Sequence, residues 1–202
     1  PGMVLTAFSP QNIDRFVTIY RATRRAGRVF IADVYLAHVL DELGIPSLPN
    51  ANQGGFRVYL PYLQRQRIIR DRAFDLVSPY RSARIYPDEI AKDANRFVML
   101  FRDSMIGDID RLPPRTASTL IYSLWPGYLH RAGSKLEDWC REGEIRFDLA
   151  HTSGHADAAT LARVATAINA KTVVPIHTQA PLRMKVLTAN VKIVRDGDWL
   201  DT

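Results

Sequence analysis

Residues 147–178 read FDLAHTSGHADAATLARVATAINAKTVVPIHT, and this stretch decides the fold that we expect for the chain. Apolar residues alternate over residues 144–149, a pattern that predicts a β-strand. After a turn of small residues, apolar residues recur at helical spacing and predict a helix over residues 157–169. Residues 172–176 are apolar enough to form a second strand that is buried on both faces. This order predicts an α/β fold with largely parallel sheets flanked by helices.

Three of the chain's five histidines lie at the edges of these elements. His151 follows the first strand, His155 opens the helix and His177 ends the second strand. Ligands of open α/β sheets bind at the carboxyl ends of the strands, so one turn would bring His155 and His177 to the same edge. The alternative is structural: a single histidine at a strand end is commonly just hydrogen-bonded, and a Ser-Gly pair is an ordinary turn.

The turn before the predicted helix has the chemistry of an anion site. The backbone amides of Ser153, Gly154 and His155 lead into a helix N-terminus, which favours an anion, and the Ser153 hydroxyl adds a donor. A protonated His155 would neutralise a phosphate or protonate a leaving group. A neutral His177 would serve as a metal ligand. If these residues are functional, the stretch predicts phosphate-ester hydrolysis.

Two short motifs in the same stretch resemble a known family. HTSGHA at residues 151–156 is followed by VPIH, whose His177 lies 22 residues after His155. Both contexts and the spacing resemble the end of the β-CASP metallo-β-lactamase family, which includes the ribonuclease J enzymes and RNA 3′-end-processing endonucleases. One departure is that ribonuclease J enzymes usually carry Gly-Glu after the second histidine, where this chain has Thr178 and Gln179.

The resemblance implies a role for each residue of the site. His155 would contact the scissile phosphate and assist the leaving group as the catalytic residue. Ser153, Gly154 and His151 would form the phosphate-binding site. His177 would be the last ligand of a zinc centre that holds two ions in the complete enzyme.

The resemblance also implies a division of the chain. Residues 1–6 would be a strand of the metallo-β-lactamase domain, residues 7–145 the β-CASP cap domain, and residues 146–202 the closing segment of the αββα metallo-β-lactamase domain. The family's main zinc motif, H-x-H-x-D-H, does not occur in the sequence. We therefore expect the chain to be the C-terminal portion of a hydrolase and to be inactive by itself. The missing part would precede it or lie on another chain.

The composition is that of a soluble globular protein, with 47% hydrophobic and 24% charged residues among 202. No run of 18 apolar residues is present, so no transmembrane helix and no membrane partner are expected. A single cysteine, Cys140, excludes an internal disulfide and favours a reducing, cytoplasmic compartment. We expect it to be a half-buried helix residue rather than a nucleophile. The net charge of +6 is compatible with RNA or another nucleic acid as partner.

The remaining elements follow from hydrophobic periodicity and from turn and cap residues. Ser9 is the predicted N-cap of the first helix, whereas Asp33 is the N-cap of the second helix and Gly44 its end. Ser134 is the predicted cap of a later helix. The predicted strands are residues 3–6, 28–32, 56–60, 96–101 and 118–124; the predicted helices are residues 9–27, 33–43, 63–77, 87–93, 134–141 and 181–187; and a terminal hairpin is predicted over residues 191–200.

Arginines are frequent in two predicted helices, over residues 9–27 and 63–77. Such charges commonly complement the carboxyl end of a helix or face solvent. The alternative is a contact with nucleic acid, because arginine and aromatic side chains together bind single strands.

Two functions from different classes are consistent with the sequence. In the first, the chain is part of a zinc-dependent ribonuclease or phosphodiesterase that acts on RNA. In the second, it is a non-catalytic nucleic-acid-binding or assembly module. A homo-oligomer, or a complex with the missing N-terminal half, is the expected assembly. An upstream H-x-H-x-D-H motif in the parent gene would favour the first function.

Overall fold

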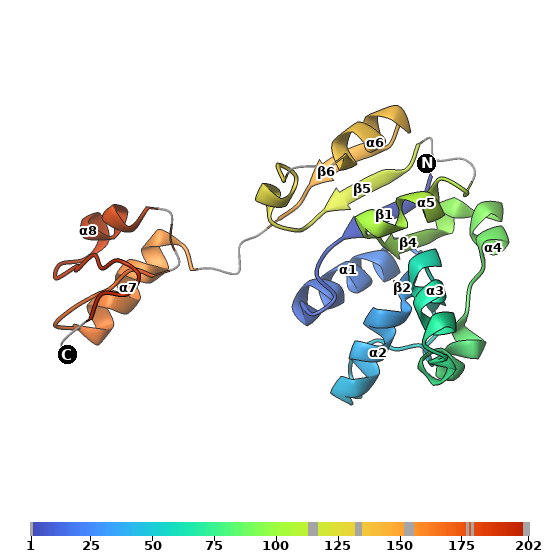
Figure 1. Ribbon diagram of the computed structural model, residues 1–202, viewed down its shortest axis with the longest axis horizontal. Coiled ribbons are helices and arrows are strands. Elements are labelled where there is room, and N and C mark those ends of the chain that lie inside the picture. Colours follow the sequence, from blue (N-terminus) through green and yellow to red (C-terminus); the bar gives the residue numbers. More distant parts are fainter. Residues whose placement is uncertain are drawn as a thin grey trace. The chain divides into compact units, whose positions relative to one another are not determined.

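The computed structural model describes residues 2–112, 117–131, 135–151, 156–176, 178 and 180–199. The chain forms two compact units, Pro1–Thr152 and Ser153–Thr202 (Figure 1). No helix among these residues is long and apolar enough to cross a membrane.

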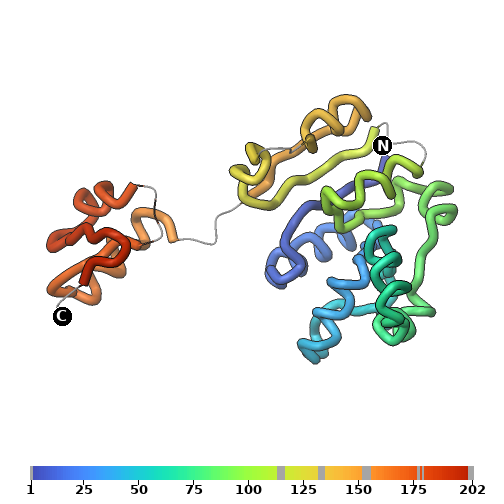
Figure 2. Tube along the Cα trace, viewed as in Figure 1, coloured from blue at the N-terminus to red at the C-terminus, as the bar shows by residue number. Residues whose placement is uncertain are grey.

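The first unit is built on a parallel sheet of six strands in the order β3-β2-β4-β1-β5-β6. In the register, Leu5 lies opposite Met99 on one side and Leu120 on the other. From β3 at one edge, the chain returns through residues 60–96 to β4 beside the central β1 (Figure 2). The α/β fold with a parallel sheet, predicted from the sequence, is confirmed. The strands are β1 (Val4–Ala7), β2 (Val29–Asp33), β3 (Phe56–Tyr59), β4 (Phe97–Leu100), β5 (Thr119–Tyr122) and β6 (Arg146–Leu149).

Helices cover both faces of this sheet, because successive side chains of each strand point to opposite faces (Figure 1). One core contains Phe30 and Val98 of the strands, and α1 and α2 pack against it. The other contains Leu5 and Met99 and is covered by α4, α5 and α6. The helices of the first unit are α1 (Ile13–Arg25), α2 (Val34–Leu43), α3 (Tyr62–Arg70), α4 (Pro87–Lys92), α5 (Ile106–Ile109) and α6 (Leu136–Glu142).

Capping residues set the ends of the helices, and one of the predicted caps is wrong. Asp33 caps α2 as predicted, since its carboxylate accepts a hydrogen bond of 2.8 Å from the Leu36 amide, and Gly44 ends α2 with a φ of +59°. The predicted cap Ser9 is wrong for α1. Asn12 caps this helix, and its side-chain oxygen accepts from the Arg15 amide at 3.0 Å. The predicted cap Ser134 lies outside the described residues.

The predicted helix over residues 63–77 is also shorter than expected. It stops at Arg70, two residues before Arg72 adopts a φ of +54°. A separate 3-10 turn, Phe74–Leu76, follows. A left-handed residue interrupts the α-helical ladder, so the two halves cannot form one continuous helix.

The predicted domain boundaries at residues 6 and 145 do not coincide with the observed boundary of the compact units. The β1 strand pairs with both β4 and β5 in the middle of the sheet, and β6 pairs with β5 at its edge. The observed boundary falls between Thr152 and Ser153. The sheet's hydrogen bonds therefore hold both terminal strands in the first unit.

The second unit is helical in its regular parts. Helix α7 (Ala158–Ile168) starts at Asp157, whose side chain accepts a hydrogen bond of 2.7 Å from the Thr160 amide. A 3-10 turn, Pro181–Arg183, leads into α8 (Met184–Leu187). None of the described residues of this unit is buried.

Two strand predictions in the second unit are wrong for the described residues. Residues 172–176 form a single bridge, between Val173 and Val191, and Ile176 is 79% exposed instead of buried. The terminal hairpin is reduced to a turn at Gly197, in which the Asp198 amide donates to the Arg195 carbonyl at 3.0 Å. A short apolar segment needs neighbouring strands to pair with, and the described part of this unit offers it one bridge.

Candidate functional site

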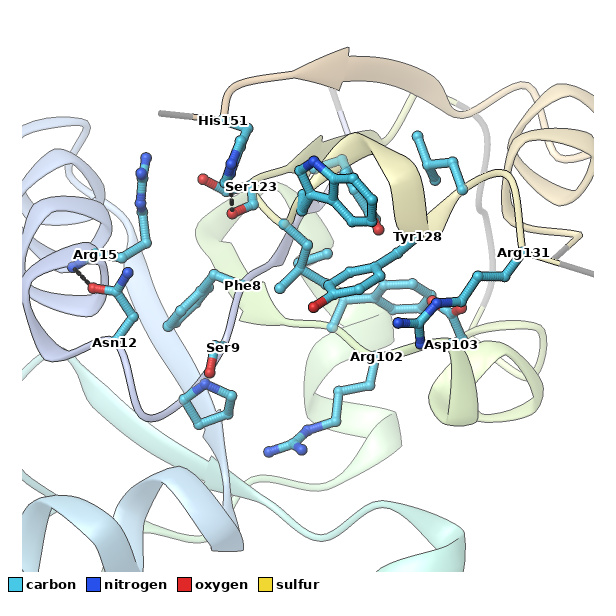
Figure 3. Close-up of a pocket in the computed structure, with 17 residues that line it drawn as sticks. Phe8, Ser9, Asn12, Arg15, Arg102, Asp103, Ser123, Tyr128, Arg131 and His151 are labelled. Carbon is cyan, nitrogen blue, oxygen red and sulfur yellow. Dashed lines mark hydrogen bonds between the residues drawn. The ribbon is translucent and has the colours of Figure 1, made fainter. Parts of the chain in front are cut away.

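A cleft of about 770 Å³ opens at the carboxyl ends of four strands of the first unit (Figure 3). Its walls come from the residues that directly follow β1, β4, β5 and β6. The lining includes the charged, polar and aromatic side chains of Arg15, Arg102, Asp103, Ser123, Trp125, Tyr128, Arg131 and His151.

The topology of the sheet explains why a cleft forms at this edge. The connection that leaves β1 enters α1 on one face, whereas the connections that leave the neighbouring β4 and β5 enter α5 and α6 on the other. Loops that diverge in this way leave a crevice beyond the strand ends, where ligands of open α/β sheets bind.

His151 is held at this edge by Tyr122, the last residue of β5, and by Ser123, which follows it. The Ser123 hydroxyl donates to the carbonyl oxygen of Ala150 at 2.6 Å, and the Ala150 amide donates to the carbonyl of Tyr122 at 2.9 Å. Nδ1 of His151 lies 3.4 Å from the carbonyl oxygen of Ser123 (Figure 3). The pairing of β5 and β6 thus continues beyond the strands and fixes the backbone on which the imidazole is carried.

An aromatic wall with a cation forms another side of the cleft. The rings of Trp125 and Tyr128 meet edge to face with centroids 5.4 Å apart, and the Arg131 guanidinium lies 4.2 Å from the Tyr128 centroid. A Cβ atom at Gly127 would lie 2.2 Å from the Trp125 ring, so a larger residue would have to displace that ring. Trp125 remains 50% exposed, which leaves ring surface for a ligand.

The described lining of the cleft carries more positive than negative charge. Arg15, Arg102 and Arg131 are cations, and Asp103 is the acidic residue among them. Arg102 also lies 2.8 Å from the buried Asp33 carboxylate, so much of its charge is balanced there. Burial raises the pKa of Asp103 above its usual range. The cleft therefore favours an anionic ligand that also offers a flat apolar surface.

Of the site residues predicted from the sequence, the structure describes His151, which lines this cleft. Ser153, Gly154, His155 and His177 lie outside the described residues. The predicted strand–helix–strand unit that would bring His155 and His177 together is not formed as expected. Its first strand is β6 of the first unit, while Val173 belongs to the second unit.

The described residues do not fit a zinc ion. No group of three or more histidine, cysteine, aspartate or glutamate side chains among them is arranged to hold a metal. A zinc centre would therefore need ligands from outside the described residues.

Sequence reasoning missed several residues of the cleft. Asp103, Ser123 and Arg131 do not stand out in the sequence, although Asp103 closely follows the predicted strand 96–101 and Ser123 lies near the end of the predicted strand 118–124. The signal that could have found them is position, because polar residues just beyond the carboxyl ends of parallel strands meet at one edge. Nothing in the local pattern around Arg131 indicates that it reaches the same edge.

Comparisons with known proteins bear on the fold. No protein-family model and no curated protein matched the sequence. A solved structure described as the crystal structure of a protein of unknown function from Enterococcus faecalis V583 is similar, with a TM-score of 0.64 and 20% sequence identity. The match covers 98% of this chain and 40% of that one, so this chain spans about two fifths of the length of the solved protein. At this identity the likeness shows a shared fold.

Proposed function

We propose that this chain is the substrate-holding portion of a zinc-dependent hydrolase that acts on RNA, with the β-CASP-like cap in its first unit. The observation that carries the proposal is the cleft itself. It places His151, the first residue of the HTSGHA motif, beside arginines and an exposed tryptophan at the carboxyl edge of the sheet. Phosphate groups and bases are the ligands that such side chains bind.

Three kinds of side chain in the cleft would hold RNA: arginine, tryptophan and histidine. Arg131 would neutralise a backbone phosphate, and the exposed face of Trp125 would stack on a base. In its protonated form, in which both ring nitrogens donate, His151 would give a hydrogen bond to a phosphate oxygen from the nitrogen that does not face Ser123. Because the described residues do not fit a zinc ion, we derive no catalytic step through the metal.

Binding of a fluorescently labelled single-stranded RNA to the 202-residue chain tests the holding role. We expect the Arg131→Ala variant to bind more weakly, and the slope of its salt dependence to fall by about 0.7, the value for a single backbone phosphate. The control is Arg96→Ala, which removes an exposed arginine that pairs with Asp93 at 3.5 Å. Equal affinities for the Arg131 and Arg96 variants, or no binding by the parent chain, would refute the proposal.

The catalytic half of the proposal is tested on His155 and His177 in the longer protein. If His177 is a zinc ligand, His177→Ala lowers the zinc content. If His155 is a general acid, His155→Ala keeps the zinc and slows single-turnover cleavage by roughly 10²–10⁴-fold. Loss of metal from the His155 variant alone would reverse the two assignments.

A non-catalytic nucleic-acid-binding module is the second candidate. The observation that favours it is the packing of Arg131 on Tyr128 beside Trp125, because arginine and aromatic side chains of this kind can bind RNA without a metal. The two candidates share RNA binding and differ in metal-dependent cleavage by the longer protein. RNA that is bound but remains intact in the presence of zinc would decide for the module.

A further inference from the structure

A second cluster of arginine and tyrosine side chains lies near the end of β3, among residues of the first unit that do not line the large cleft. These side chains surround a small pocket of about 150 Å³. The arginine–tyrosine cluster is defined here as Tyr62, Arg65, Arg84, Tyr86 and Arg111.

Each tyrosine of the cluster has a guanidinium against its ring. Arg65 and Arg111 lie 5.5 Å and 5.3 Å from the centroid of Tyr62, and Arg84 lies 5.4 Å from that of Tyr86. Tyr62 is nevertheless 39% exposed and Tyr86 56% exposed. Large aromatic rings on the surface, held by cations and open to solvent, can stack on bases while the cations meet phosphates.

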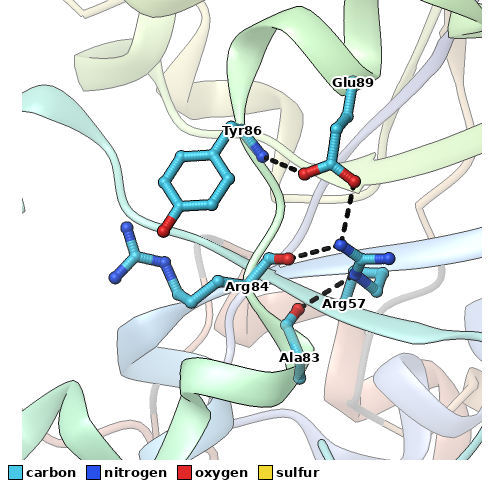
Figure 4. Close-up of polar contacts among 5 residues, drawn as sticks. All are labelled: Arg57, Ala83, Arg84, Tyr86 and Glu89. Carbon is cyan, nitrogen blue, oxygen red and sulfur yellow. Dashed lines mark hydrogen bonds and ion pairs between the residues drawn. The ribbon is translucent and has the colours of Figure 1, made fainter.

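The segment that carries Arg84 and Tyr86 is fixed to the edge of the sheet (Figure 4). The Arg57 side chain donates from Nε to the carbonyl of Ala83 at 3.1 Å and also donates to the carbonyl of Arg84. Glu89 accepts from Arg57 at 3.1 Å and from the Tyr86 amide at 3.2 Å. These bonds fix the backbone that carries Arg84 and Tyr86, so less ordering entropy would be lost if the two side chains bound a ligand.

The carboxylate that lines the pocket is already engaged. Asp108 is buried, and its Oδ1 accepts from the Tyr59 hydroxyl at 2.9 Å and from the Tyr62 amide at 2.9 Å. Burial, followed by the bond to Asp108, raises the pKa of Tyr59, so this phenol stays neutral. Asp108 therefore anchors Tyr62, and the three arginines of the cluster leave the pocket with net positive charge.

We propose that the arginine–tyrosine cluster binds single-stranded nucleic acid, with one backbone phosphate in the pocket and bases on Tyr62 and Tyr86. The pocket is smaller than the roughly 300–1,000 Å³ of ordinary small-molecule sites, so a whole nucleotide does not fit inside it. A phosphate group does fit, with its bases left at the rim. The inference rests on the proposed function for the identity of the strand as RNA, and it adds a second point of contact away from the cleft.

The experiment measures binding of a labelled single-stranded RNA to the full 202-residue chain as a function of salt. We expect Arg65→Ala/Arg111→Ala to weaken binding at least tenfold and to lower the salt slope by about 0.7, the value for the one phosphate held in the pocket. The matched control is Arg67→Ala/Arg70→Ala, which removes the same charge from α3, the helix that carries Arg65. Equal losses of affinity in both double variants would overturn the cluster as a site.

Stacking is tested separately, because removal of charge alone weakens any anion contact. Tyr86→Ala should weaken binding by between about fivefold and a hundredfold, whereas Tyr86→Phe, which keeps the ring, should bind like the parent chain. Both variants are checked for an unchanged melting temperature. A duplex of the same sequence should bind more weakly, since its bases are already stacked. Equal affinity for the duplex, or an unchanged affinity of Tyr86→Ala, would overturn the proposal.

The cluster and the cleft fail in distinguishable ways. If Arg131→Ala weakens binding and the cluster variants do not, the cluster is refuted and the proposed function stands. If the cluster variants alone weaken binding, the cluster stands and the cleft is refuted. If the parent chain does not bind RNA, both are refuted.

Discussion

The carbonyl oxygen of Ser123 lies 3.4 Å from Nδ1 of His151, although the two residues are 28 positions apart in the chain. Ser123 directly follows β5 and His151 is the second residue after β6, and the pairing of β5 with β6 sets their distance. The contact orients the imidazole from its Nδ1 side. The other ring nitrogen is then the one that can meet a ligand.

We expect His151→Ala to weaken RNA binding by about 1.5–3 kcal/mol, the value of one hydrogen bond to a charged group. His38→Ala is the control, because His38 lies on α2, 3.8 Å from Glu42, and does not line the cleft. Titration of labelled RNA by fluorescence anisotropy measures both. A His151 variant with parental affinity would remove this residue from the site.

Asp33 is predicted to be a main stabilising residue of the first unit. Its side chain is fully buried, and it accepts from the Leu36 amide and from Gln64 at 2.8 Å each, beside the ion pair with Arg102. Asp33→Ala removes the helix cap and leaves the partly buried Arg102 unpaired. We expect the free energy of unfolding to fall by about 3 kcal/mol, measured by urea denaturation.

The double variant Asp33→Ala/Arg102→Met separates the unpaired charge from the cap. It should be more stable than Asp33→Ala alone, because no buried cation then remains without a partner. If the double variant is less stable by the sum of both single effects, the ion pair does not account for the loss of stability.

The Asp103 carboxylate should lower the stability of the first unit at neutral pH, and this cost should disappear at low pH. Burial raises the pKa of this carboxyl, so the folded protein holds the proton more tightly than the unfolded chain does. The charged form therefore costs stability at neutral pH, and the cost disappears as pH falls below the ordinary aspartate pKa of about 3.9. We expect Asp103→Asn to raise the melting temperature at pH 7 and to have no such effect at pH 3.

The matched control for this pH dependence is Asp75→Asn, at an exposed aspartate. Its melting temperature should follow that of the parent chain at both pH values. A decrease in melting temperature for Asp103→Asn at pH 7 would mean that the carboxylate makes a favourable contact in the folded state.

Cys140 should be unreactive in the folded protein. Burial, with smaller contributions from Glu137 and Asp103, raises the pKa of this thiol to about 11. At pH 8 its thiolate fraction is then roughly two orders of magnitude below that of a free cysteine, and the reagent must also reach a buried sulfur. Labelling with iodoacetamide, followed by mass spectrometry, should be slow in buffer and fast in urea. Rapid labelling in buffer would show that the sulfur is accessible.

Local features of this chain could be predicted from the sequence. The segments that became β2 and β4 have continuous apolar runs, and Asp33 and Gly44 have the chemistry of a helix start and a helix end. The same reasoning failed for residues 172–176, where an apolar run predicted a buried strand. A strand is stabilised by its neighbours in a sheet, and the composition of the run does not say whether neighbours exist.

The sequence by itself determined the alternation of strands and helices, and with it a parallel sheet. Tertiary structure alone decided the strand order, which places β1 between β4 and β5. That order brings Arg15, Asp103, Arg131 and His151 to one cleft although they are far apart in the chain. The physical reason is that periodicity reports which face of each element is apolar, whereas lateral hydrogen bonds and packing between distant segments select the neighbours.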